Sequence, residues 1–258
     1  MSQYKIFIIF AFIILLAILG PAIAPYDPFQ ISGDPYQGIS LTHILGTDGL
    51  GRDIFSQILS GSRITLFVAI SAALICLVLS LVLGLLSSLR SIFSQIISAV
   101  VDSFIAVPPL FIMIFLGSII GSSIYSEIII IALAYWPQIS KSYRAEVISL
   151  FERGYVDAST ALGGNTIWII RRHIIPNMAH LTLANFTYLT GVAIVSESIL
   201  SFLGLGDQRY FSWGMIFYYA FLQGAIYYGL WQWILAPAVL ITLIAYALFE
   251  SSKDILMR

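Results

Sequence analysis

The sequence predicts an all-α, polytopic membrane protein with six transmembrane helices. Of its 258 residues, 59% are hydrophobic and only 10% are charged, against about 25% charged residues in a typical soluble domain. Several uncharged runs reach the roughly 20 residues that a helix needs to cross a bilayer. Backbone groups cannot stay unpaired in lipid, so these runs are expected to be helices. The net charge of -1 does not suggest nucleic-acid binding, and a single cysteine cannot form a disulfide within the chain.

The first predicted helix covers 6–24, an apolar run of 19 residues. A cleaved secretory signal is the alternative, because small residues end the run, but the apolar core of a signal is roughly 7–15 residues long. A retained helix is therefore expected. Residues 25–63 follow as a polar outer segment rich in proline and glycine. Within it, 54–59 suggest a short interfacial helix that serves either packing or receptor docking.

Three further helices are predicted before the middle of the chain. The second covers 64–89, an uncharged run between two arginines, and the third covers 98–120. The fourth is expected at 124–141. Only 13 uncharged residues separate Glu127 from Lys141, which is too short to cross alone, so the helix must carry Glu127 near its end.

Two more helices are predicted in the second half of the chain. The fifth covers 181–203. The uncharged run that follows has 40 residues, and one helix of that length would be about 60 Å long, twice the hydrocarbon thickness. Two crossings are one solution, but the first part of the run is dense in aromatic residues, which prefer the headgroup boundary. We expect an outer interfacial segment at 207–229 and a sixth helix at 230–249.

The distribution of basic residues predicts the orientation. With both termini in the cytoplasm, nine basic residues lie on the cytoplasmic side and three on the outer side, as the positive-inside rule requires. The cytoplasmic set is Lys5, Arg90, Lys141, Arg144, Arg153, Arg171, Arg172, Lys253 and Arg258. A seventh crossing would move the last two outside and weaken this asymmetry.

Residues 142–178 form the largest predicted cytoplasmic loop, and their pattern indicates two short helices. Small residues recur at helical spacing before the Gly163-Gly164 pair, which can end a helix in the left-handed conformation. Asn165 or the residue after it can cap a second helix that stops at Pro176. That helix is expected to present Ile167, Ile170 and Ile174 on one side. A plain solvated loop is the simpler interpretation, but such a helix pair suits a groove on a partner.

This loop resembles the EAA loop of the inner-membrane permeases of bacterial and archaeal binding-protein-dependent ABC importers. That loop reads Glu-Ala-Ala, three residues, Gly, nine residues, then Ile-x-Leu-Pro. Here DAS at 157–159 precedes Gly163 by three residues, and HIIP at 173–176 follows it after nine. The chain has Asp for Glu, Ser for the second Ala, His for Ile and Ile for Leu. RHIIPN at 172–177 is similar to the RHILPN of the dipeptide, oligopeptide and nickel branch.

Two further stretches resemble the same branch. HILGTD at 43–48, followed by GRDIFS at 51–56, is similar to the outer segment before the second helix of that branch. LSFLGLG at 200–206, followed by WG at 213–214, is similar to the end of its fifth helix. The resemblance therefore extends from residue 43 to about residue 214 in three ordered motifs.

The resemblance implies a permease subunit of the bacterial or archaeal cytoplasmic (inner) membrane, which is not itself an enzyme. It implies a sister permease, most simply in a heterodimer, two ATPase subunits that hold ATP and Mg, and an extracytoplasmic substrate-binding protein. No cofactor is expected on this chain, whose glycine-rich 46–53 lacks the Gly-Lys-Ser/Thr of a phosphate-binding loop. Peptides are the expected cargo, with nickel or a metal chelate as the alternative. The expected ATPase contact is made by Arg153, Tyr155, Asp157, Ala158, Ser159, Leu162, Gly163, Ile174 and Pro176.

Polar residues inside the predicted helices are candidates for the translocation pathway. A charge in the membrane costs about 2.5–3.5 kcal/mol on insertion scales and is a functional hypothesis by default. Glu197, with its neighbour Ser196, is the better candidate, and Asp102 is the second. A paired structural carboxylate is the alternative for each. Pro108 and Pro109 should kink the third helix, either as a gating hinge or as a packing bend.

Two other classes of function compete with the importer. In an ion-coupled secondary transporter, Asp102, Glu127 and Glu197 would relay ions, and the helix pair at 142–178 would have no role. An intramembrane hydrolase is disfavoured because the sequence contains neither His-Glu-x-x-His nor Gly-x-Ser-x-Gly. Uptake that depends on ATP, and not on an ion gradient, discriminates the importer from the secondary transporter.

Overall fold

The computed structural model describes residues 2–89 and 91–257, with side chains from residue 8 onward. Within these ranges the chain is helical, and the only bridge of extended backbone is an isolated one between Thr47 and Asp53. The predicted all-α class is confirmed. Three basic residues counted above lie outside the description: the side chain of Lys5, Arg90 and Arg258.

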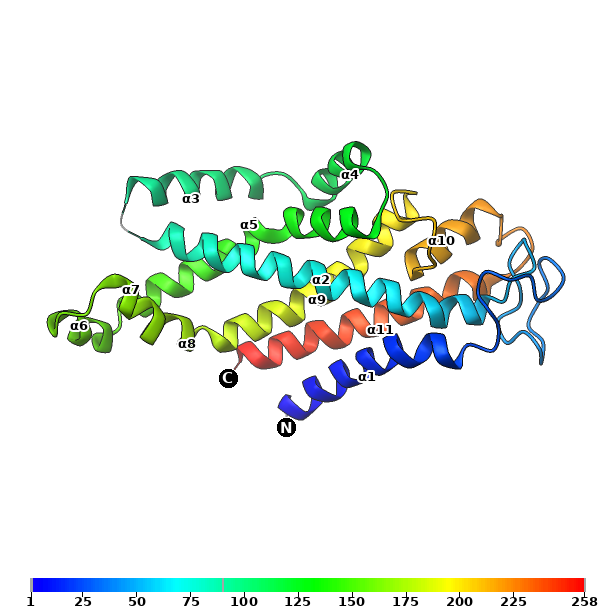
Figure 1. The fold of residues 1–258 in the computed structure, drawn as a ribbon, viewed down its shortest axis with the longest axis horizontal. Helices are drawn as coiled ribbons and strands as arrows, with labels where there is room; N and C mark the ends of the chain where they lie inside the picture. Colours follow the sequence, from blue (N-terminus) through cyan, green and yellow to red (C-terminus); the bar gives the residue numbers. More distant parts are fainter. Residues whose placement is uncertain (1, 90, 258) are drawn as a thin grey trace.

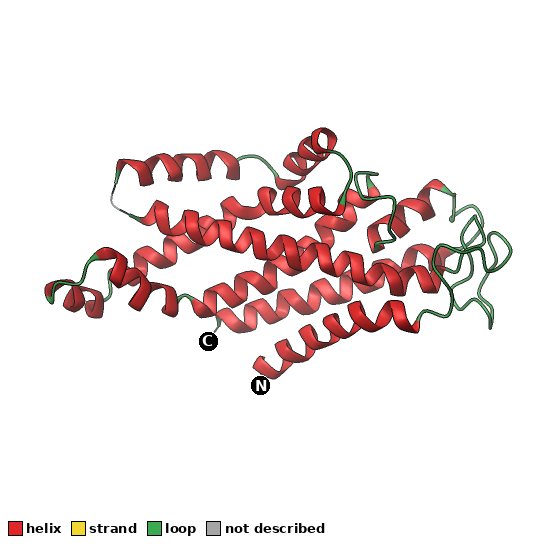
Figure 2. Ribbon diagram, in the orientation of Figure 1, coloured by secondary structure: helices red, strands yellow, loops and turns green. Residues whose placement is uncertain are grey.

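Five long helices run along the length of the molecule and form a bundle (Figures 1 and 2). They are α1 (Ser2–Ile23), α2 (Ile54–Ser88), α5 (Ile124–Phe151), α9 (Ala179–Phe202) and α11 (Trp231–Leu256). α2 contacts α1, α5 and α9, and α9 contacts α11. α2 is therefore the central helix of the bundle.

The two ends of the bundle differ. One end carries the loop 24–53 and α10 (Trp213–Leu222). The other end carries four short elements, which are α6 (Gly154–Ala161), α7 (Thr166–Ile169), the π-helix η1 (Ile170–Ile174) and α8 (Ile175–Asn177). In Figure 1 both chain termini lie in the half of the molecule nearer these short elements.

Within the described residues, three helices are long and apolar enough to cross a membrane: α2, α9 and α11. α3 (Ile92–Ile105) and α4 (Pro109–Ile120) make a fourth candidate if they are counted as one broken span, because they meet at an angle of 90°. The prediction of one helix over 98–120 was therefore wrong. Pro108 and Pro109 end α3 and start α4, since proline has no N–H for the helix ladder but fits the first helical turn.

Helix boundaries differ from the sequence prediction most at the two ends of the bundle. α2 begins at Ile54, not at 64, because the side chain of Asp53 accepts the N–H of Ser56 and caps the helix there. The short interfacial helix expected at 54–59 is the start of α2. α5 continues past 141 to Phe151, and α11 continues past 249 to Leu256.

The aromatic stretch predicted as an interfacial segment divides into buried and exposed residues. Trp213 and Trp233 are fully buried, and the indole of Trp213 donates to the carbonyl of Ile58 at 3.1 Å. Tyr227 and Tyr228 are exposed. The indole at Trp213 thus fixes α10 to α2, so part of the aromatic density serves packing and not the headgroup boundary.

Candidate functional site in the polar segment between α5 and α9

Residues 152–178 leave the bundle at the end of α5 and return to it at α9 (Figure 1). Their anchor is an apolar cluster in which Val156, Ile169 and Ile174 pack with Val147 and Leu150 of α5. The segment is thus a folded unit attached to α5, as its capping residues predicted.

The turn between α6 and α7 depends on Gly163. Its φ is +91°, a region that residues with a Cβ rarely adopt. Gly164 N–H donates to the carbonyl of Ser159 at 3.0 Å, which closes the end of α6. The side chain of Asn165 then accepts the N–H of Trp168 at 2.8 Å and caps α7. Of the alternatives, Gly163 takes the left-handed conformation and Asn165 takes the cap.

η1 places the isoleucines differently from the prediction. The N–H of Ile175 donates to the carbonyl of Ile170, which is the i→i+5 bond of a π-turn. Residues five apart then share a side, so Ile169 and Ile174 are both buried while Ile167 is exposed. Ile167, Ile170 and Ile174 do not form one face. Ile174 has no exposed surface (0%), so it supports the segment from inside and offers no contact surface.

His173 connects the two halves of the segment. Its Nε2 lies 3.2 Å from the hydroxyl oxygen of Ser159, and its ring packs against Tyr155 and Trp168 at centroid distances of 5.5 and 5.3 Å. Its backbone carbonyl accepts from the side-chain amide of Asn177 at 2.6 Å. The sequence patterns gave no indication of a role for His173 or Trp168. The EAA pattern has Ile at the position of His173, and this difference could have indicated a particular role for the histidine.

Most residues assigned to the ATPase contact lie on the surface of the segment. Leu162, at the tip beside Gly163, is 90% exposed. Ser159 is half-buried. The exposed members of the predicted set are Arg153, Tyr155, Asp157, Ala158, Leu162, Gly163 and Pro176.

Asp102 and Lys141 form an ion pair of 2.8 Å between α3 and α5. Both side chains are more than half exposed. Asp102 is therefore paired with a cation of α5, and its role in the translocation pathway stays a prediction. An exposed pair of this kind contributes little to stability in water.

Glu197 is enclosed by the bundle and has no exposed surface (0%). Its carboxylate accepts from the hydroxyls of Ser201 at 2.9 Å and Ser198 at 3.4 Å, all on α9. Ser196 donates to the phenol oxygen of Tyr135 on α5 at 3.0 Å. Glu197 and Ser196 therefore both form hydrogen bonds inside the bundle.

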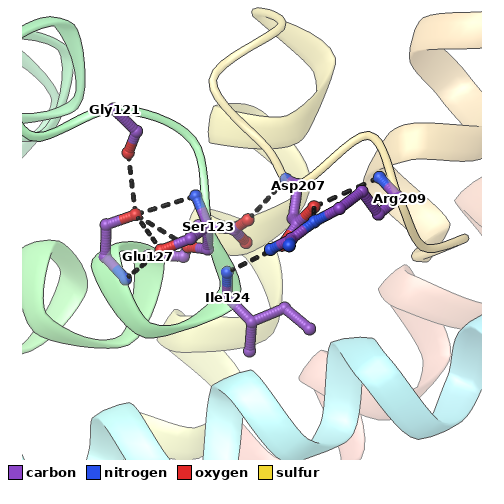
Figure 3. A network of polar contacts seen from close by, with 7 residues as sticks. Gly121, Ser123, Ile124, Glu127, Asp207 and Arg209 are labelled. Carbon is purple, nitrogen blue, oxygen red and sulfur yellow. Dashed lines mark hydrogen bonds and ion pairs between the residues drawn. The ribbon is translucent and has the colours of Figure 1, made fainter.

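A second buried carboxylate joins α5 to the loop after α9 (Figure 3). Glu127 Oε1 accepts the N–H of Asp207 at 2.9 Å. The carboxylate of Asp207 accepts from the side chain of Arg209 through two bonds of 2.9 and 2.7 Å. These bonds hold the pKa of Asp207 below its ordinary value against the opposing effect of burial. Sequence reasoning placed Glu127 at a helix end and did not find this partner.

The loop before α2 is organised by two buried aspartates. Nδ1 of His43 lies 2.9 Å from Oδ1 of Asp53, whose other oxygen caps α2. Asp48 accepts from the backbone of Leu50 and from the side chains of Arg52 and Gln57. The motif at 43–56 is therefore a loop that is held in one conformation by hydrogen bonds to these two aspartates.

No group of three or more His, Cys, Asp and Glu residues that could hold a metal ion occurs in 2–89 and 91–257. Cys76 is buried.

The chain is similar to known transport proteins. A family model described as binding-protein-dependent transport system inner membrane component matches residues 80–258. A putative peptide permease protein of Brucella suis is 33% identical over 232 residues, which cover 88% of this chain and 77% of the relative. The dipeptide transport system permease protein DppC of Bacillus subtilis is 31% identical over 242 residues, which cover 93% and 75%.

The fold is similar to that of a solved transporter. An inward-facing structure of the MetNI methionine ABC transporter aligns with a TM-score of 0.60 at 17% identity, covering 76% of this chain and 94% of that chain. At this identity the likeness concerns the fold alone.

Proposed function

The chain belongs to the family of binding-protein-dependent transport system inner membrane components, and from this premise we propose that it carries peptides across the inner membrane as half of an ATP-driven importer. Its relatives in Brucella suis and Bacillus subtilis are named as peptide and dipeptide permeases. Those names favour peptides over nickel or a metal chelate. The chain is the permease subunit, and ATP hydrolysis belongs to separate ATPase subunits in this proposal.

The proposed topology has six crossings, with both termini in the cytoplasm. The six are α1, α2, the broken pair α3 and α4, α5, α9 and α11. Two observations support it: the termini lie in the half of the molecule that carries α6 to α8, and the basic residues divide nine to three in this orientation. Residues 152–178 then face the cytoplasm.

The proposed contact with an ATPase subunit is the exposed tip of residues 152–178. The observation that carries this proposal is the combination of Leu162, 90% exposed at the tip, with Val156 and Ile169 buried against α5. A surface that must transmit force needs an exposed apolar contact and a packed connection to the membrane helices. Leu162, the residue that caps the end of α6, supplies the first, and Val156 within α6 supplies the second.

The remaining subunits of the proposed importer are a sister permease, two ATPase subunits that hold ATP and Mg, and an extracytoplasmic substrate-binding protein. This chain needs no cofactor of its own in that arrangement. Its half of the pathway would be completed by the sister permease.

The proposal is tested by reconstituting the chain with its partner subunits in proteoliposomes. A labelled dipeptide presented with the binding protein should accumulate when ATP is supplied to the ATPase side, and accumulation should persist when an ionophore collapses the ion gradients. Uptake driven by an ion gradient without ATP would instead establish a secondary transporter. Accumulation of radioactive nickel, but of no peptide, would overturn the assignment of the cargo.

A further inference from the structure

A polar cleft of about 630 Å³ lies where α2, α3 and α5 meet, near the end of the bundle that carries α6 and α7. It is separate from residues 152–178. It is lined by Ser87, Ser88, Leu89, Ser91, Ile92, Ser94, Gln95, Arg144 and Ile148. Its charge comes from one cation, since Arg144 is the ionisable residue in this set.

Arg144 is held in place but retains free donors. Its Nε donates to the carbonyl of Ser87 at 3.0 Å, which fixes the guanidinium against the end of α2. Arg144 is absent from the ion pairs formed by the described residues, and the nearby Asp102 is paired with Lys141. A guanidinium has five N–H donors. Its terminal nitrogens can therefore serve an anion in the cleft.

The start of α3 supplies further donors to the same cleft. The Ser91 side chain caps α3 by accepting the N–H of Ser94 at 3.1 Å, and its own hydroxyl hydrogen has no acceptor among the described atoms. The backbone N–H of Gln95 donates to the carbonyl of Ser91 at 3.4 Å, whereas its exposed side-chain amide has no hydrogen-bond partner among the described residues. Together with Arg144, these groups form a set of donors suited to the oxygens of a phosphate.

Apolar residues border the donors. Ile92 is 78% exposed, and Phe93 and Ile148 are also exposed. α2, which ends at the cleft, is one of the helices that can cross the membrane. An occupant with an anionic head beside the donors and acyl chains beside these residues fits both surfaces. Basic pockets between membrane helices on the cytoplasmic side bind such head groups.

We propose that this cleft binds the phosphate head group of an anionic phospholipid. The proposal requires that the chain lies in a membrane, and it is independent of the cargo and of the contact with an ATPase. Failure of peptide uptake would leave it standing.

The test uses the assembled importer purified in detergent, with phosphatidylglycerol, phosphatidylcholine or inorganic phosphate added. Phosphatidylglycerol should raise the Tm, and native mass spectrometry should show it bound. Arg144→Gln should weaken this binding at least about tenfold, because charge-assisted hydrogen bonds to the phosphate are lost. Arg63→Gln is the matched control, since Arg63 is an exposed arginine in the half of α2 that lies away from the cleft.

Gln95→Ala provides a second test in case Arg144→Gln does not fold. Gln95 is exposed, so its loss should leave folding intact and weaken phosphatidylglycerol binding by a few fold. Equal binding of phosphatidylglycerol by wild type and both variants would overturn the proposal. An equal Tm increase with phosphatidylcholine would also overturn it, and saturation by inorganic phosphate alone would assign the cleft to free phosphate.

Discussion

Glu127 and Asp207, 80 residues apart in the sequence, are joined by a hydrogen bond of 2.9 Å between a buried carboxylate and a backbone N–H. This bond connects the first turn of α5 to the loop that follows α9 (Figure 3). Glu127 is therefore a structural carboxylate with an identified partner, and the ion relay considered for a secondary transporter is not needed to explain it.

Replacing Glu127 by alanine should destabilise the protein by about 1–3 kcal/mol, because the N–H of Asp207 would lose its acceptor. Glu127→Gln keeps an acceptor oxygen at the same position and should cost less. The Tm of the purified importer in detergent measures both. Equal Tm values for the alanine and glutamine variants would show that the bond does not contribute.

The ion pair of Asp207 and Arg209 predicts a dependence of stability on pH. The pKa of Asp207 is lowered from its ordinary value of 3.8, chiefly by the hydrogen bond from Arg209. A carboxyl with a lowered folded-state pKa adds stability above that ordinary value and loses it as the pH falls through the folded-state pKa.

Arg209→Gln should therefore lower the Tm at neutral pH, by a small amount because Arg209 is 73% exposed. The difference between variant and wild type should be constant from pH 7 to 5, as estimated from the ordinary range of aspartate. It should shrink in acid as Asp207 protonates in both proteins. A difference that grew in acid would contradict this assignment.

Gly163→Val should abolish ATP-dependent uptake while the protein still inserts and folds. A residue with a Cβ pays roughly 1–2 kcal/mol in the left-handed region, so the turn between α6 and α7 should change its backbone. Gly154→Val is the matched control: both glycines have open space around the position of a Cβ, but only Gly163 has a positive φ. Uptake and ATP hydrolysis are measured for both variants. Normal uptake by Gly163→Val would refute the role of the turn.

Asp53→Ala should cost about 1–3 kcal/mol of stability, since it removes the cap of α2 and leaves His43 without its partner. Asp34→Ala is the control, because that side chain is exposed on the same loop. Thermal unfolding of the two variants should separate them clearly. Equal Tm values would mean that the loop is held by other contacts.

The sequence predicted the helical class and the approximate position of each long helix, because uncharged runs report directly on burial in lipid. It also located the turn at Gly163, where one backbone conformation requires one residue type. It misplaced the start of α2, although Asp53 and Ser56 are a recognisable capping pair. The uncharged run that begins after Arg63 favoured a start at residue 64 more strongly than the capping pair favoured a start at residue 54.

Other features could not be read from local patterns. The burial of Ile174 results from a π-turn, and no spacing rule for α-helices anticipates it. The partner of Glu127 lies in a loop whose position depends on the packing of α9 against α5. Pro108 and Pro109 indicated a bend, but not its angle of 90°, and α4 contacts α5 and α9, which are distant in the sequence from α3.

α5 is one long helix that links the two ends of the bundle. Its 28 residues, at about 1.5 Å each, span about 42 Å. One end is fixed to the loop after α9 through Glu127, and the other packs against Val156 of α6 through the shared apolar cluster. A force on α6 would therefore either shift α5 as a rigid helix or bend it at Pro137. Proline has no N–H, so one backbone hydrogen bond of the helix is missing there. A rigid shift would move both ends of α5, whereas a bend at Pro137 would confine the movement to the half of the bundle nearer α6.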